Sequence, residues 1–448
     1  MNPRGLNTVE ATLTHHTVMK PNLQSRTIFL GDNLDFLRGI NSACIDLVYA
    51  DPPFNKKKQF TAPIGSAAEG ASFLDLFGEE DVKDEWVAEL RHENYELHAY
   101  LCGVKAMGNS YNYCYLVYMA IRLIECCRIL KSTGSLYLHC DHTMSHYLKL
   151  LLDCIFGERG FRSEINWNGG SVSGFKSRRK GWIRQSDIIL YYVKGDNFTF
   201  NKQYLPYRQE YIDSMFKGAD QDGRKYRARG GKKYYADEGG TPLGHNWTDI
   251  YSLQTTTQLP EVTGYPTQKP LKLMQRIIAA SSNKGDWVLD PFCGCVTTCI
   301  AAELLERHWV GIDVAAESWA QIERRLNTEI PPDLLRGPAH KSTTPPKRGK
   351  SDTRPKKSVY VISNPAYPGI YKVGVAGNVK ARLNSYQTAD PRRGYRLEYH
   401  RQTAHYRDLE AHIHAKFNGD HEWVPGALAD IIEAIKAYRP AQDDHLGF

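Results

Sequence analysis

The sequence predicts an α/β protein with a doubly wound, Rossmann-like parallel sheet and a separate small α+β domain at its C-terminal end. Three observations lead to this prediction. β-like and helical segments alternate within residues 26–330, a Tyr- and Gly-rich polar stretch interrupts them at 200–262, and a basic, Pro-rich segment lies at 336–357. Alternating strands and helices are typical of parallel, doubly wound sheets. A chain of 448 residues also exceeds one ordinary core, so we expect more than one domain.

The predicted elements form three runs. The first has β-like segments at 26–32 and 43–51 around a short helix at 34–40. The second has a helix at 116–130, a turn at 132–134, a strand at 135–140, a helix at 147–156 and a strand at 187–193. The third has helices at 272–280, 297–306 and 318–326 and strands at 286–290 and 308–314. The predicted domains are an N-terminal extension at 1–25, the α/β domain at 26–330, a linker at 331–357 and the small domain at 358–448.

Composition narrows the class of protein. Hydrophobic residues make up 42% of the chain and charged residues 24%, as in soluble globular proteins. No apolar run approaches membrane-spanning length and the N-terminus lacks a signal peptide's apolar core, so we expect a cytoplasmic protein with no membrane partner. All ten cysteines precede residue 300 without a CxxC pair, which argues against a disulfide framework or a zinc site. The segment at 336–357 suits a flexible linker and a polyanion-binding stretch equally well.

The first chemical motif is Asp51-Pro52-Pro53-Phe54, directly after a predicted strand. Ligands of open α/β sheets bind beyond the carboxyl ends of strands. The prolines leave rigid carbonyl acceptors, Asp51 adds a carboxylate, and Phe54 adds a flat apolar ring. This set suits an aryl amine, because both N–H bonds are accepted while the ring stacks. Such acceptors stabilise the charge that develops when this weak nucleophile attacks. A plain Pro-rich turn explains the four residues alone equally well.

A second predicted strand end carries a complementary set. Asp290 ends the strand, Phe292 and Gly294 belong to a turn, and Thr297 opens a helix. An acid, a glycine turn and a helix N-terminus together form a cradle for an amino-acid carboxylate and a sugar. Asp313 ends the next strand, about 20 residues further on, where the diol of a ribose is usually bound.

These motifs resemble those of the DNA amino-methyltransferases, in the circularly permuted (beta) class whose catalytic motif precedes the cofactor motif. The likeness covers approximately residues 25–330. It implies S-adenosylmethionine as cofactor, duplex DNA as substrate and a restriction–modification role, and it allows a homodimer. The leading Asp51 implies adenine N6 rather than cytosine N4. Residues 165–260 would recognise the target sequence.

The same resemblance assigns the cofactor-binding residues: Asp32, Thr267, Lys269, Asp290, Phe292, Gly294, Thr297 and Asp313. The sequence departs from the family at two places. Cys295-Val296 stands where the family usually has Ser-Gly, and Tyr265 stands where it has His. A β-branched valine in a tight turn restricts φ and adds bulk beside the cofactor, which puts cofactor binding in doubt.

The target base must leave the duplex, which costs about a few kcal/mol. Basic residues beside the cleft must therefore hold the phosphates, and Lys56–Lys58 and Lys176–Lys180 are the candidates. For any one of them, a solvated loop charge is an equally good interpretation. Methylation at cytosine C5 is disfavoured because it needs a thiolate, usually in a Pro-Cys pair, and the sequence has no such pair.

Residues 358–448 resemble the GIY-YIG nuclease superfamily. By position, Tyr360 would activate water, Arg382 would face the scissile phosphate, and Glu410 would bind Mg²⁺. Lys372 stands where the superfamily has a second tyrosine, so an inactive DNA-binding module remains an alternative.

The sequence therefore predicts a DNA adenine methyltransferase joined to a domain that cleaves or binds DNA. Three alternatives stay open. The chain could be a non-catalytic DNA-binding protein with two degenerate enzyme domains, or it could methylate cytosine N4. It could also methylate RNA or a protein glutamine, because the two prolyl carbonyls would serve those reactions in the same way.

Overall fold

The computed structural model describes residues 20–439 except Ile64, Ala67, Ala71, 171–177, Arg179, 254–260, 350–351, 353–356, Ala404 and His421. Most of the predicted N-terminal extension and of the basic stretch Lys176–Lys180 lies outside the described residues. The chain divides into two compact units, Met1–Asp81 with Asn109–Arg348 (unit 1) and Val82–Gly108 with Gly349–Phe448 (unit 2). The division differs from the predicted domains because 82–108 belongs with the C-terminal part.

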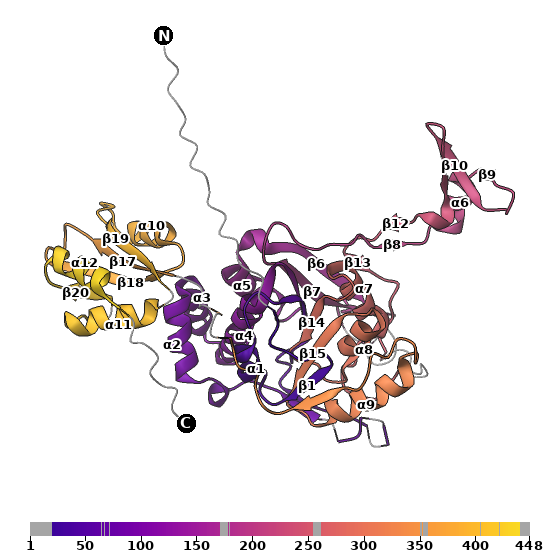
Figure 1. Ribbon diagram of the computed structural model, residues 1–448, viewed down its shortest axis with the longest axis horizontal. Helices are drawn as coiled ribbons and strands as arrows, with labels where there is room; N and C mark the ends of the chain where they lie inside the picture. The colour runs from indigo at the N-terminus through magenta and orange to yellow at the C-terminus, as the bar shows by residue number, and fades with distance from the viewer. Residues whose placement is uncertain are drawn as a thin grey trace, which may run out of the picture. The chain divides into compact units, whose positions relative to one another are not determined.

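Unit 1 is built on a nine-stranded sheet in the order β13-β6-β7-β5-β2-β14-β15-β1-β16 (Figure 1). Its strands are β1 (Thr27–Leu30), β2 (Ile45–Ala50), β5 (Leu130–Cys140), β6 (Phe161–Asn168), β7 (Ser186–Val193), β13 (Asn246–Trp247), β14 (Trp287–Asp290), β15 (His308–Asp313) and β16 (His340–Ser342).

The sheet is mixed, which corrects the prediction of a parallel sheet. β7 runs antiparallel to both of its neighbours, β5 and β6, whereas the other paired strands are parallel. Antiparallel neighbours can be joined by a loop, while parallel neighbours need a crossover. The sequence of β7 hides its direction, because a strand buried on both faces reads as one apolar run in either case.

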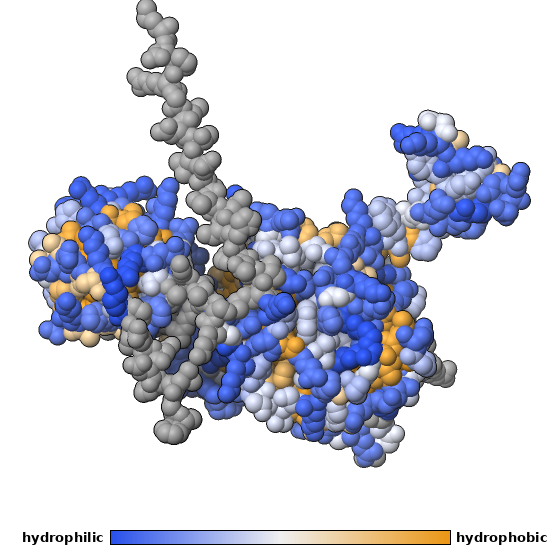
Figure 2. All heavy atoms as spheres, viewed as in Figure 1, coloured by the Kyte–Doolittle hydropathy of each residue, from blue (hydrophilic) through white to orange (hydrophobic). Residues whose placement is uncertain are grey.

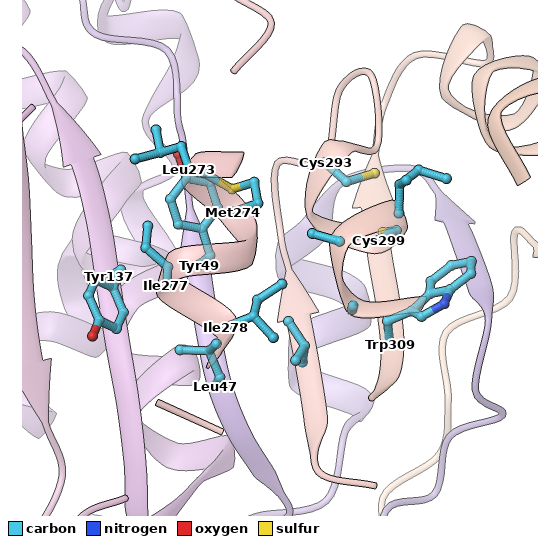
Figure 3. Close-up of a cluster of buried hydrophobic side chains, with 14 of the residues drawn as sticks. Leu47, Tyr49, Tyr137, Leu273, Met274, Ile277, Ile278, Cys293, Cys299 and Trp309 are labelled. Carbon is cyan, nitrogen blue, oxygen red and sulfur yellow. The ribbon is translucent and has the colours of Figure 1, made fainter. Parts of the chain in front are cut away.

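Helices cover both faces of the sheet, as expected for a doubly wound fold (Figure 1). α1 (Asn33–Gly39), α4 (Ser110–Ile129) and α5 (Ser145–Phe156) pack together on one face. α7 (Leu271–Ser281), α8 (Thr297–Leu304) and α9 (Glu317–Glu329) pack together on the other. Figure 3 shows how Ile277 and Ile278 of α7 meet Leu47 and Tyr49 of β2 in the buried core between these helices and the sheet.

Most predicted elements of unit 1 are confirmed, although α4 begins at Ser110, six residues before its predicted start. The strand β6 was not predicted, and β5 begins at Leu130 directly after α4, so that the expected turn at 132–134 lies within the strand. In the predicted linker, β16 pairs with β1 as an edge strand. A three-residue edge strand needs no core of its own, so a basic, Pro-rich segment can supply it. Across the described residues, no helix is long and apolar enough to cross a bilayer.

The polar stretch after β7 forms a small module. A two-stranded sheet, β8 (Tyr204–Leu205) with β12 (Thr241–Pro242), joins its two ends. Between them lie α6 (Gln209–Met215) and a three-stranded antiparallel sheet of β9 (Gly218–Ala219), β10 (Lys225–Arg229) and β11 (Lys232–Tyr235). Figure 2 shows that the visible surface of this module is largely hydrophilic.

Unit 2 is α+β, as predicted. Its four-stranded sheet has the order β19-β17-β18-β20, formed by β17 (Lys357–Ser363), β18 (Ile370–Ala376), β19 (Arg396–Thr403) and β20 (Trp423–Pro425). Its helices are α10 (Val379–Ala389), α11 (Tyr406–Lys416) and α12 (Leu428–Ala437), together with α2 (Asp84–Glu93) and α3 (Tyr95–Ala106) from the segment 82–108. α2 and α3 had not been predicted.

Candidate active site

Two loops from neighbouring strands enclose a pocket in unit 1. β2 and β14 are parallel partners, so the loops that follow them lie at the same edge of the sheet. The pocket between these loops has a volume of about 370 Å³. It is lined by all twelve residues that the sequence assigned to catalysis and cofactor binding in this unit: Asp32, Asp51, Pro52, Pro53, Phe54, Thr267, Lys269, Asp290, Phe292, Gly294, Thr297 and Asp313. The fold therefore brings together motifs that lie far apart in the sequence.

The carboxylate of Asp51 has a lysine partner. Lys269 Nζ lies 2.5 Å from Asp51 Oδ2 and also donates to the carbonyl of Thr267 at 3.2 Å. The sequence placed Lys269 with the cofactor, whereas the structure places it against the carboxylate of the first motif. Both side chains are mostly buried. The ammonium thus holds Asp51 in one orientation at the wall of the pocket.

The backbone after the two prolines is fixed by Asp75, at the end of β4 (Ser72–Asp75). Asp75 Oδ2 accepts from the Phe54 amide at 3.2 Å, and Oδ1 accepts from the Asn55 amide at 2.5 Å. Asn55 has a φ of 61°, a left-handed conformation that needs such support. Burial raises the pKa of Asp75, and the backbone donors oppose that shift. No sequence motif pointed to this residue, because its partners lie in another segment of the loop.

The predicted phosphate-binding lysines follow the same loop. Lys56 Nζ lies 4.7 Å from the ring centre of Phe54, Lys57 Nζ 4.4 Å from that of Tyr111, and Lys58 Nζ 4.4 Å from that of Phe60. All three lysines are exposed, so they remain accessible to an anionic ligand.

Asp290 anchors the second loop. Its carboxylate accepts from Thr298 Oγ1 at 2.6 Å and from the Phe292 amide at 3.0 Å. Burial raises the pKa of Asp290 to about 7, although both hydrogen bonds act in the opposite direction. This carboxyl group can therefore change its charge near neutral pH.

Asp313 ties the loop after β14 to the loop after β15. Its carboxylate accepts from the Gly294 amide at 2.7 Å and from the Ala315 amide at 2.8 Å. Burial is the main cause of the raised pKa of Asp313. Each oxygen retains a further acceptor position, so the residue can still bind a hydroxyl group.

Asp32 lies in the loop after β1, beside the end of β15 that carries Asp313, and caps α1 through the Leu34 amide. Arg122 of α4 donates to it at 2.7 Å and to Asn33 Oδ1 at 2.6 Å. Sequence reasoning missed Arg122. Its sequence signal is a charge in the middle of the apolar stretch of α4, which also carries Arg128 in its last turn, and such a charge is buried only when it is paired.

Unit 2 contains a separate polar cluster. The Tyr360 hydroxyl accepts from Arg382 Nε at 3.1 Å and lies 2.9 Å from the Tyr386 hydroxyl. Glu422 then accepts from Arg382 at 2.6 Å and from Lys372 at 3.0 Å. The structure thus brings together the predicted Tyr360 and Arg382, with Glu422 as the carboxylate that neutralises the cations.

Glu410 lies on α11, next to Leu409. The buried residues Leu409 and Ile413 of this helix pack with Val359 and Val361 of β17. Tyr360 alternates with these valines and belongs to the other face of the strand. No group of three or more His, Cys, Asp and Glu side chains that could hold a metal is found within the described residues. Mg²⁺ usually keeps several waters and needs only one or two carboxylates beside substrate phosphates, so the Mg²⁺ site at Glu410 stays a prediction.

Comparison with known families identifies both parts of the chain. Residues 45–324, more than half of the chain, match the DNA methylase family (N6_N4_Mtase). The chain belongs to this DNA methylase family. Residues 357–439 match the T5orf172 domain.

Several curated relatives are similar to this chain. The Type II methyltransferase M.EcaI of Enterobacter cloacae is 30% identical over 44% of this chain and 54% of its own length. The Type II methyltransferase M.BamHI of Bacillus amyloliquefaciens is 26% identical over 64% of this chain and 54% of its own length. The DNA adenine methyltransferase YhdJ of Escherichia coli is 28% identical over 68% of this chain and 83% of its own length. The chain thus spans about half the length of the first two relatives.

The departures from the family pattern lie at the turn before α8. Val296 has a φ of 60° and a ψ of 23°, the left-handed region, although it is fully buried. Such a conformation is an outlier for a β-branched residue. Tyr265 lies against the same turn, because a Cβ added to Gly294 would lie 3.1 Å from its ring. Cys295 and Tyr265 therefore line the pocket together, whereas Val296 is fully buried and does not line it.

Proposed function

We propose that this chain transfers a methyl group from S-adenosylmethionine to adenine N6 in duplex DNA. The observation that carries the proposal is the single pocket that contains Asp51 and Phe54 on one side and the turn at Asp290–Thr297 on the other. Asp51 and the prolyl carbonyls accept the two N–H bonds of the base amine, and Phe54 stacks on its ring. The leading Asp51 and the name of the relative YhdJ, a DNA adenine methyltransferase, favour adenine over cytosine.

The pocket fits the proposed cofactor. Five carboxyl groups line it, those of Asp32, Asp51, Asp75, Asp290 and Asp313, against three cations, those of Lys56, Arg122 and Lys269. S-Adenosylmethionine carries positive charge on its sulfonium and its ammonium group, so the charges are complementary. When bound, the cofactor supplies the methyl group on its sulfonium. Gly294, with a φ of 46°, keeps the turn free of a side chain on this wall.

Target recognition is proposed for residues 165–260. Within this region, the hairpin β10–β11 carries five basic side chains and no acid, those of Lys225, Arg227, Arg229, Lys232 and Lys233. A two-stranded ribbon has dimensions that the major groove of DNA accepts. Cleavage of DNA by unit 2 stays a prediction.

The test is to incubate the protein with tritiated S-adenosylmethionine and duplex DNA, and to digest the product to nucleosides. Label in N6-methyladenine is the expected result, and Asp51→Ala should abolish it. Label in N4-methylcytosine would correct the choice of base. Absence of label in either nucleoside would favour the non-catalytic alternative, and stronger competition by RNA than by DNA would favour an RNA substrate.

A further inference from the structure

A buried polar chain lies directly behind the ring that is proposed to stack on the target base. The imidazole of His139, on β5, is stacked on Phe54 with 5.7 Å between ring centres and 20° between planes. His139 is fully buried, whereas Phe54 lines the pocket. One face of the Phe54 ring is therefore covered by His139, and a base can stack only on the other.

The orientation of His139 is fixed on two sides. Its Nδ1 lies 3.0 Å from the hydroxyl of Tyr49 on β2, and its Nε2 lies 3.2 Å from a carboxylate oxygen of Asp187 on β7. A carboxylate only accepts, so Nε2 carries a proton, and in the neutral imidazole Tyr49 then donates to Nδ1. The indole of Trp167 meets the imidazole edge-on at 5.7 Å and 87°. Neither rotation of the ring nor a flip preserves these contacts.

The electrostatics agree with this geometry. Burial acts to raise the pKa of Asp187, but the hydrogen bond from His139 and the charges of Lys269 and Lys56 act in the opposite direction, and the pKa lies well below its usual range. Burial raises the pKa of Tyr49 well above its usual value, so the phenol keeps its proton as the donor.

We propose that His139 is a positioning residue for methylation: clamped by Tyr49 and Asp187, it sets the plane of Phe54 and thereby the plane of the extruded base, so that the base amine meets Asp51. This inference rests on the proposed function. A loosely held Phe54 would stack on the base less tightly and would therefore bind the target duplex more weakly, while the cofactor half of the pocket would be unaffected. An aromatic contact of this kind corresponds to about a two- to tenfold change in an equilibrium constant.

The test compares variants after the recognition sequence has been found by sequencing methylated DNA. His139→Leu should raise the KM for target duplex about three- to tenfold and leave the Kd for S-adenosylmethionine within about twofold. His139→Phe keeps the stacked ring and should recover part of the loss. An unchanged KM for DNA in folded His139→Leu would overturn the inference, as would a parallel rise in the cofactor Kd. A wild-type protein that methylates no nucleic acid would instead refute the proposed function, and the inference with it.

A matched pair covers the case in which His139→Leu does not fold. Tyr49 and Tyr137 are cross-strand partners on β2 and β5, and both hydroxyls are buried in hydrogen bonds. Tyr49→Phe removes the bond to His139, whereas Tyr137→Phe removes a bond to Ser281 away from Phe54. Only Tyr49→Phe should raise the KM for DNA. Equal values for the two variants would show that the effect is general loss of packing, and would reject the positioning role.

Discussion

Lys269 Nζ lies 2.5 Å from Asp51 Oδ2 at the wall of the pocket, although the two residues are 218 positions apart in the sequence. Only 9% of the lysine side chain and 16% of the aspartate side chain are exposed, so water screens the pair weakly. The ion pair therefore joins the proposed amine-binding motif to the segment after the target-recognition region. The proposed base-binding and cofactor-binding segments share this contact.

Loss of this ion pair should slow transfer more than it weakens cofactor binding. Lys269→Met leaves Asp51 without its donor, and a hydrogen bond to a charged group contributes about 1.5–3 kcal/mol. We expect kcat to fall about ten- to a hundredfold, measured as tritium transferred to DNA under saturating cofactor. Lys269→Arg, which keeps the charge, should be less impaired. A wild-type kcat for Lys269→Met would show that the ion pair has no role in transfer.

Gly294 should be required for cofactor binding. Its φ is 46°, and an added Cβ would lie 3.1 Å from the ring of Tyr265, at the pocket wall. Gly294→Ala should weaken binding of S-adenosylmethionine about tenfold, as measured by calorimetry, because the wall must shift or the turn must change. Gly285→Ala is the control. Its φ is 84° and an added Cβ there meets nothing within 4 Å, so this variant strains the backbone without pressing on any neighbouring group. Equal affinities in the two variants would argue against a shaped wall at Gly294.

Asp290 should make the stability of unit 1 depend on pH. Its folded-state pKa of about 7 lies above the ordinary value of 3.8, so the folded protein keeps a proton that the unfolded chain has already lost. This stabilisation is complete below about pH 4 and is lost as the pH rises towards 7, in total on the order of 4 kcal/mol. Calorimetric unfolding at pH 5 and pH 7.5 should show a smaller difference for Asp290→Asn than for wild type. An identical difference would mean that Asp290 ionises normally.

The local part of the site could be predicted from the sequence. Asp51 and Asp290 each stand at the end of a short apolar strand. The functional groups of the turn after each strand come from consecutive residues, so the sequence alone shows them together. Because parallel strands end at one edge, two such turns must lie close together once both belong to the same sheet. The strained turn at Val296 could also be predicted from the sequence, because a β-branched valine stands where the family usually has a glycine.

The supporting partners could not be predicted, because each comes from a distant segment whose own sequence is ordinary. Asp75 fixes the backbone after Phe54 from a separate hairpin, and His139 reaches its ring from β5. The sequence of β7 did not reveal its direction, and its antiparallel pairing brings Asp187 to His139. Contacts of this kind depend on strand order, and single motifs contain no information about that order.

Removal of the C-terminal region should expose an apolar surface within residues 82–108. Trp86 and Leu90 lie four residues apart on α2 and are 5% and 1% exposed, and α2 packs against α3 and β18. A chain ending at Arg348 lacks β18 and the rest of the unit 2 core, although the match to the DNA methylase family ends earlier, at residue 324. Each newly exposed large side chain costs about 1.5–3 kcal/mol of burial energy. We therefore expect the truncated chain to bind the dye ANS and to aggregate, whereas the full chain does neither.

The double change Trp86→Ser and Leu90→Ser in the truncated chain should reduce both effects. A truncated chain that stays monomeric and binds no dye would show that α2 and α3 do not need the C-terminal sheet.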